Sequence, residues 1–183
     1  MASIDIIEEL CKNTDADSVP KIDPNTQSPV KDTVQNPDIR SAVIPVVLIG
    51  FYKNTRNGED AAKLMHEGGN KATLEYLFGD EKSNIIKSVS NYSGVSETYA
   101  ESEMKNTVSS IKDVLIKENI SEDGVAVSNF FTDQRSNILK HLPVELNMGK
   151  LMNDSSIDDR TNKMEGPMSG LMHTIEKVFS STK

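Results

Sequence analysis

Apolar residues recur with helical spacing along most of the chain, and short polar stretches separate them. The clearest pattern follows Gly166-Pro167, where apolar positions repeat at intervals of three and four residues. This spacing places them on one face of a helix. We therefore predict an amphipathic helix over residues 166–183. We call its apolar face the C-terminal stripe: Met168, Leu171, Met172, Ile175, Val178 and Phe179.

Residues 39–53 are almost continuously apolar. An Asn36-Pro37 start suits the N-cap and first position of a helix, so we predict a central helix buried on most sides. The β-branched content also allows a strand, but the start, the length and the polar exit favour a helix. Gly50 within it would allow a neighbouring helix to approach closely.

Shorter helical patterns fill the rest of the chain and end at glycines or polar turns. Ser96 is a predicted N-cap for a longer helix that ends near Asn119. Its inward face is predicted to carry Tyr99, Met104, Val108, Ile111, Val114 and Leu115. Together these patterns predict an all-α fold.

One thirteen-residue phrase occurs twice, at residues 77–89 and 130–142, with six identical positions. Asp80 and Asp133 are predicted to cap helices that carry matching aliphatic residues. The repetition predicts two related small helical bundles that shield each other's apolar faces. Two equivalent binding sites built from the shared Asp, Ser and Asn are the alternative, although helix capping already explains these residues.

The composition divides the chain into three parts. Residues 1–36 comprise an N-terminal helix and an irregular arm containing Pro20, Pro24 and Pro29. Residues 37–150 form the helical repeat domain, and residues 151–183 form a polar linker followed by the C-terminal amphipathic helix. The arm is either a plain linker, which we favour, or a segment that wraps around a partner.

The charge of the chain disfavours binding to nucleic acid or to anionic membranes. Its 28 acidic residues outnumber the 20 basic ones, which gives a net charge of −8. Lys53, Arg56 and Lys63 form a modest basic cluster. That cluster leaves a nucleic-acid-binding helical bundle as an alternative function.

The longest apolar run, residues 42–52, covers half a membrane span, so no membrane span is predicted. The N-terminus shows no secretory pattern. The single cysteine, Cys11, excludes an intramolecular disulfide and is typical of a reducing compartment. These features predict a cytoplasmic protein.

Candidate chemistry is sparse. The three histidines, His66, His141 and His173, are scattered, and the pair His173 and Glu176 has no second pair to complete a metal site. Residues 153–159 are rich in oxygen donors but lack the central glycine and final glutamate of a calcium loop. Nucleophile and phosphate-loop motifs are absent. We therefore predict no catalytic, metal-binding or cofactor-binding residues and no cofactor.

The order of features over residues 37–150 is similar to that of a known family. A long helix with a central Pro45 leads to Asn-x-x-x-Gly, then to YLFGD, a helix ending in SNYSG, another long helix and QRSNILKHLP. This order resembles the YidB-like bacterial proteins, known as domain of unknown function nine-three-seven. The proline-rich segment before Asn36 departs from that pattern.

The resemblance implies an all-α fold of two related small bundles, with no established activity and no agreed functional residues. Some relatives are fused to peptidoglycan-binding OmpA-like modules, which implies envelope-related roles for part of the family.

The sequence thus favours a non-catalytic protein–protein interaction or structural module that forms a homodimer or binds a protein partner through the C-terminal stripe. Packing of that stripe on its own domain is the alternative. An enzyme of unrecognised type is the remaining alternative function.

Overall fold

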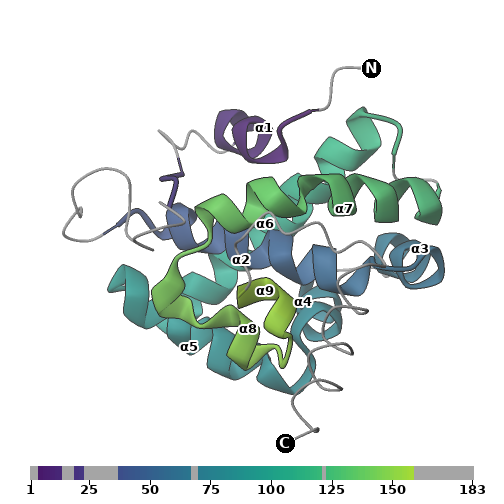
Figure 1. Cartoon of the computed structure of the whole chain (residues 1–183). Helices are drawn as coiled ribbons and strands as arrows, with labels where there is room; N and C mark the ends of the chain where they lie inside the picture. The colour runs from purple at the N-terminus through teal and green to yellow at the C-terminus, as the bar shows by residue number, and fades with distance from the viewer. Residues whose placement is uncertain (1–3, 14–18, 23–36, 67–69, 121–122, 159–183) are drawn as a thin grey trace, which may run out of the picture.

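The computed structural model describes residues 4–13, 19–22, 37–66, 70–120 and 123–158. The regular secondary structure in these ranges is helical, which confirms the all-α class. The other helices are arranged around α2 (Figure 1). In chain order the elements are α1 (Ile6–Asn13), α2 (Ile39–Asn54), α3 (Gly58–His66), α4 (Asn70–Phe78), the 3₁₀ turn η1 (Gly79–Glu81), α5 (Lys82–Ser93), α6 (Glu97–Lys117), α7 (Gly124–His141), the 3₁₀ turn η2 (Val144–Leu146), α8 (Met148–Leu151) and α9 (Ser155–Asp158).

Helix α2 lies at the centre of the fold, and thirteen of its sixteen residues are buried. It contacts every helix from α1 to α7. The helix predicted for this segment is therefore confirmed against the strand alternative. Burial on all sides outweighs the weak helix propensity of its many β-branched residues.

The start of α2 differs from the prediction. The helix begins at Ile39, and its N-cap is Asp38. The Asp38 carboxylate accepts the backbone N–H of Arg40 at 3.0 Å and forms an ion pair with the Arg40 guanidinium at 2.8 Å. The predicted cap, Asn36, lies outside the described residues. An aspartate that satisfies a free backbone N–H and also binds a cation is a strong cap.

Helix α6 begins where the sequence predicts, because the Ser96 side chain accepts the backbone N–H of Tyr99. The predicted inward position of Tyr99 is wrong, since this side chain is 48% exposed. Ala100 takes the buried position instead, in register with Met104 and Ile111. Helical spacing predicted the stripe correctly from Met104 onward and missed its phase at the first turn.

The two repeated phrases do not adopt the same local structure. The first, residues 77–89, runs from the end of α4 through η1 into α5. The second, residues 130–142, lies almost entirely in the uninterrupted α7. The predicted caps are therefore wrong: Asp80 lies within η1, and Asp133 lies in the middle of α7. What the two phrases share is burial of the aliphatic residues Ile85, Ile86 and Val89 in one, and Ile138, Leu139 and Leu142 in the other.

One position explains why the two phrases diverge. The first has Gly79 where the second has Thr132. Gly79 adopts φ +52°, a left-handed conformation that breaks the helix. A β-branched threonine strongly disfavours that conformation. Thr132 instead continues α7, and its hydroxyl donates to the carbonyl oxygen of Ser128.

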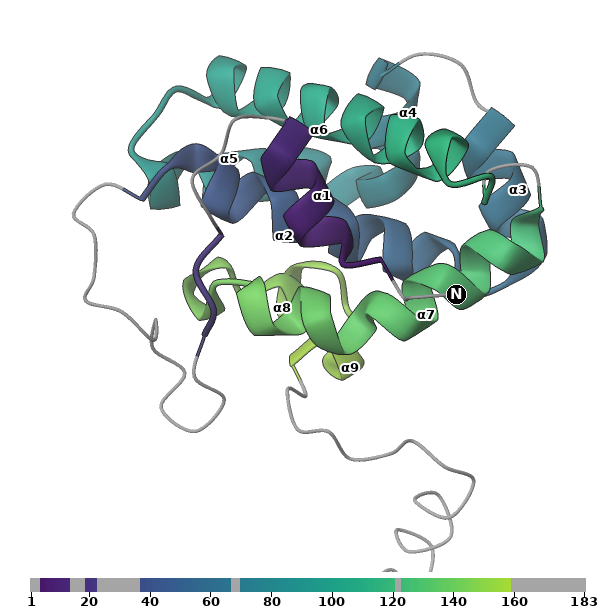
Figure 2. The same ribbon diagram turned by 90° about the horizontal axis from the view of Figure 1, so that it is seen from above.

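The buried apolar residues of the described chain form one continuous core. Phe51 of α2 stacks on Phe131 of α7, with ring centroids 5.3 Å apart. Ile6 and Leu10 of α1 belong to the same core, as does Ile157 of α9. Seen from above, α1 lies between α6 and α7 (Figure 2). Elements from both ends of the described residues thus complete one hydrophobic core.

Gly50 lies at a close helix contact, as its sequence position predicts. A Cβ atom at this position would lie 2.9 Å from the ring of Phe78, which projects from the end of α4. The Asn54 side chain, one turn further along α2, donates to the Leu77 carbonyl oxygen at 2.9 Å. The glycine therefore lets the C-terminal end of α4 approach α2 closely.

Candidate functional site

The C-terminal stripe lies outside the described residues. Its six members, Met168, Leu171, Met172, Ile175, Val178 and Phe179, therefore remain a sequence prediction, as does the pair His173 and Glu176. The described residues do show how the chain leading to this region is attached to the helical body.

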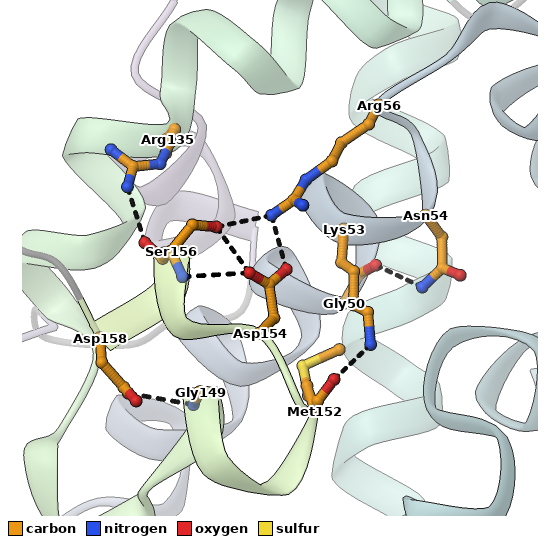
Figure 3. A network of polar contacts seen from close by, with 10 residues as sticks. All are labelled: Gly50, Lys53, Asn54, Arg56, Arg135, Gly149, Met152, Asp154, Ser156 and Asp158. Atoms are coloured by element: carbon orange, nitrogen blue, oxygen red, sulfur yellow. Dashed lines mark hydrogen bonds and ion pairs between the residues drawn. The ribbon is translucent and has the colours of Figure 1, made fainter. Parts of the chain in front are cut away.

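That attachment is a network of polar contacts between α2, α7 and the last described segment (Figure 3). Lys53 donates to the carbonyl oxygen of Met152 at 2.5 Å. Arg56 forms an ion pair with Asp154 at 2.6 Å and donates to the Ser156 hydroxyl at 2.9 Å. We call these contacts, together with that of Arg135 described next, the C-terminal clasp.

Arg135 reaches the same segment from α7 and donates to the backbone carbonyl oxygen of Ser156 at 2.7 Å. Ser156 is therefore bound by two arginines, Arg56 from the turn between α2 and α3 and Arg135 from α7. Inside the segment, the Asp158 carboxylate accepts the backbone N–H of Gly149 at 3.2 Å. These contacts fix α8 and α9 against the body, and Ile157 is buried beneath them.

The clasp gives structural roles to residues that the sequence marks as candidate chemistry. Burial acts to raise the pKa of Asp154, but hydrogen bonds from Ser156 and the charge of Arg56 outweigh it and hold the pKa below its usual value. To bind calcium, the Asp154 carboxylate would have to give up its contacts with Arg56 and Ser156. Among the residues that the structure describes, no group of three His, Cys, Asp or Glu side chains could hold a metal ion.

The basic cluster is likewise bound within the chain. Lys53 and Arg56 belong to the clasp, and Arg56 also lies 4.9 Å from the centroid of the Tyr52 ring. Lys63 forms an ion pair with Asp60 at 3.3 Å, one helical turn away. A phosphate group would have to compete with each of these contacts, which weakens the case for a nucleic-acid interface.

The repeated Asp, Ser and Asn residues do not build two equivalent sites. The Asn84 amide donates at 2.8 Å to Glu81, the N-cap residue of its own helix. The Asn137 amide instead donates to Asp5, ahead of α1, at 2.8 Å. Beside it, Gln134 donates to the Ile4 carbonyl oxygen at 2.7 Å and accepts the Ile6 backbone N–H at 3.4 Å. In the second phrase these polar residues hold α1 in place.

Part of the predicted irregular arm also contacts the body. We call residues 19–22 the N-terminal strap. The side chains of Val19 and Ile22 are buried, and the Ile22 backbone N–H donates to the Lys140 carbonyl oxygen at 2.6 Å. His141 is buried beside the strap. The rest of the arm lies outside the described residues.

The lone cysteine shows no sign of activation. Cys11 is partly buried at the edge of the core, and burial raises the pKa of its thiol. A higher pKa leaves less of the reactive thiolate at neutral pH. Cys11 therefore lies in the environment of an unreactive thiol.

Within the described ranges, no helix is long and apolar enough to cross a membrane. Comparisons with protein families, with curated proteins and with solved structures found no match to this chain.

Proposed function

We propose that the chain is a non-catalytic helical module for protein–protein association, and that it forms a homodimer through the C-terminal stripe. The observation that carries the proposal is the use of the polar residues. The side chains that marked candidate chemistry in the sequence, Lys53, Arg56, Asp154 and Asn137 among them, bind the chain's own elements. This supports a structural role over catalysis.

The distribution of exposed apolar side chains gives further support. Large exposed hydrophobic residues in the described ranges are Tyr99, Ile116 and Val125, of which the latter two are each 59% exposed. Tyr99 and Ile116 lie near opposite ends of α6. Such scattered residues do not provide a continuous surface for a six-residue apolar stripe. A second copy of the stripe would provide one, by pairing amphipathic helices face to face.

The proposal includes the YidB-like kinship and the two related helical units. The order of elements from α2, with Pro45 inside it, to α7 agrees with the order on which the resemblance rests. The buried aliphatic residues shared by the two phrases support a related origin of α5 and the end of α7. The continuous core indicates that such units share one interior.

The oligomeric state of the full chain tests the homodimer. Light scattering coupled to size-exclusion chromatography is expected to give the mass of a dimer. Ile175→Asp places a charge on the stripe and is expected to give the monomer mass, as is deletion of residues 166–183. Thr174→Asp is the matched control, because it adds the same charge to the neighbouring, off-stripe position and should leave the dimer intact.

Far-UV circular dichroism shows whether each variant retains the helical body. A full chain that remains monomeric over the accessible concentration range would contradict the homodimer. A monomeric Ile175→Asp variant that has also lost the helicity of the body would instead favour packing of the stripe on its own domain.

A further inference from the structure

The sequence contains one Asn-Gly pair, Asn57-Gly58, where the turn after α2 enters α3. Glycine has no Cβ atom to shield its backbone nitrogen, so this nitrogen can reach the side-chain amide of a preceding asparagine. Asn57 is exposed to solvent. The N–H of Gly58, the first residue of α3, has no acceptor within that helix. The two groups that react in asparagine deamidation are therefore adjacent, and water reaches the asparagine.

Asp60, in the first turn of α3, holds the Asn57 side chain. The Asn57 amide donates to the Asp60 carboxylate at 2.7 Å, and the Asn57 side-chain oxygen accepts the Asp60 backbone N–H at 2.9 Å. The first of these hydrogen bonds is the main cause that lowers the Asp60 pKa, so the carboxylate is ionised at neutral pH and accepts it there. To bond to the Gly58 nitrogen, the Asn57 side chain has to leave the position in which both of its polar atoms face Asp60.

The backbone of Gly58 packs directly against the start of α7. A Cβ atom on Gly124 would overlap the Gly58 carbonyl oxygen, and a Cβ atom on Gly58 would lie 3.0 Å from the Val125 side chain. On the other side of Asn57, Arg56 is fixed by its ion pair with Asp154. Asn57 thus lies between two residues that are anchored to different parts of the fold.

We propose that Asn57 is a self-modification site, which converts spontaneously to aspartate and isoaspartate, and that the isoaspartate product loosens α3 from α7. Asp60 sets the rate, because it holds the amide in an unreactive position. The site needs water as its only co-reactant, and it does not depend on the C-terminal stripe.

The reaction proceeds through a cyclic imide. The Gly58 nitrogen bonds to Cγ of Asn57, the Cγ–Nδ2 bond breaks, and ammonia leaves with the proton that the Gly58 nitrogen gives up. Water then hydrolyses one of the two bonds between the ring nitrogen and a ring carbonyl carbon. Cleavage at Cγ gives aspartate, whereas cleavage at the backbone carbonyl carbon gives isoaspartate, in which the main chain runs through the former side chain.

The two products have different effects on the contact between α3 and α7. Aspartate keeps the length of the main chain and an oxygen atom that can accept the Asp60 backbone N–H. Isoaspartate inserts its Cβ atom into the main chain between Arg56 and Gly58. Because Arg56 is anchored, the added length displaces Gly58 from Gly124, and closely packed backbones cannot absorb such a shift.

Ageing of the full chain at neutral pH tests the site and its control. A lysine-specific protease releases residues 54–63, and chromatography with mass spectrometry separates the three forms of residue 57. The unmodified chain is expected to accumulate both products, more slowly than a synthetic peptide of residues 54–63. Asp60→Ala is expected to accelerate the reaction by about two- to ten-fold, the effect of losing a hydrogen bond that holds the amide.

Glu59→Ala is the matched control, because it removes an exposed carboxylate from the same turn and leaves the contacts of Asp60 in place. Its rate should equal that of the unmodified chain. The proposal is overturned if residue 57 of the unmodified chain is unchanged once the peptide has reacted completely. Equal rates for Asp60→Ala and Glu59→Ala would also overturn it, because Asp60 would then not hold back the reaction.

Hydrogen–deuterium exchange of the aged chain tests the effect on α3. Helix α3 is expected to show two populations, and the one that matches the isoaspartate content should exchange about ten-fold faster or more. Freshly prepared Asn57→Asp, which carries the aspartate product, should show the slow population alone. Asn57→Gln forms the imide far more slowly and should keep one population on ageing. A single population in the aged chain, or two in aged Asn57→Gln, would overturn the proposed loosening.

Discussion

At the scale of single residues, several polar side chains of this protein join elements that lie far apart in the sequence. Arg56 and Asp154 are 98 positions apart, and Gln134 and Ile4 are 130 apart. The Ser96 cap could be predicted because donor and acceptor lie three residues apart. The long-range contacts could not be predicted, because the sequence around one partner gives no information about which distant residue it will contact.

Asp154 provides a direct test of one such joint. Asp154→Asn is expected to lower the free energy of unfolding by about 1 kcal/mol at neutral pH, because an amide cannot pair with the Arg56 guanidinium. Asp133→Asn, at an exposed position on α7, is the control and should stay within about 0.5 kcal/mol of the unmodified chain. Urea unfolding followed by circular dichroism measures both.

The effect of Asp154→Asn should depend on pH with a definite sign. The pKa of Asp154 is lowered in the folded protein, so the carboxylate contributes stability above the ordinary aspartate pKa of about 3.9. That contribution is lost as the pH falls through the lower folded value, and the gap between the two proteins should then close. A gap that stays constant on acidification would contradict the assigned role.

At the scale of elements, the sequence predicts where helices lie better than how they connect. The aliphatic residues of both repeated phrases are buried as their spacing predicts. The two phrases nevertheless differ in whether the helix is interrupted. The difference follows from Gly79 in the first phrase and Thr132 in the second. The similar sequences therefore suggested more similar structures than the two segments have. The positive φ of Gly79 separates α4 from α5, whereas Thr132 lets α7 continue as one helix.

Exchanging that residue tests this explanation. Gly79→Thr is expected to lower the free energy of unfolding by about 1 to 2 kcal/mol, since a β-branched residue is strained at positive φ. Gly79→Asn should cost less, because asparagine tolerates this conformation better. The Cβ atom at this position meets no neighbouring atom within 4 Å, so steric overlap cannot account for a loss. Equal stability of the threonine and asparagine variants would contradict the backbone explanation.

At the scale of the whole molecule, one hydrophobic core spans elements from α1 to α9. The all-α class could be predicted from helical periodicity, and the central helix from its length and its polar start and exit. The place of the terminal elements in the same core could not, because amphipathic spacing shows which face is buried but not against what.

A shared core predicts cooperative unfolding. Urea denaturation should give one transition, with the same midpoint when followed by far-UV circular dichroism and by tyrosine fluorescence. Phe131→Leu, at the contact with Phe51, should lower the free energy of unfolding by about 1 to 3 kcal/mol. Both midpoints should move to lower urea concentration together. Two separated transitions would indicate bundles that unfold independently.

The second half of α7 contacts elements from both ends of the described residues. Gln134 and Asn137 bind the residues around the start of α1, Arg135 binds α9, and the last two residues bind the N-terminal strap. During synthesis α1 leaves the ribosome long before these partners exist. Helix α1 is made before α7 and can take its place only once α7 exists, so until then its apolar side stays exposed to water.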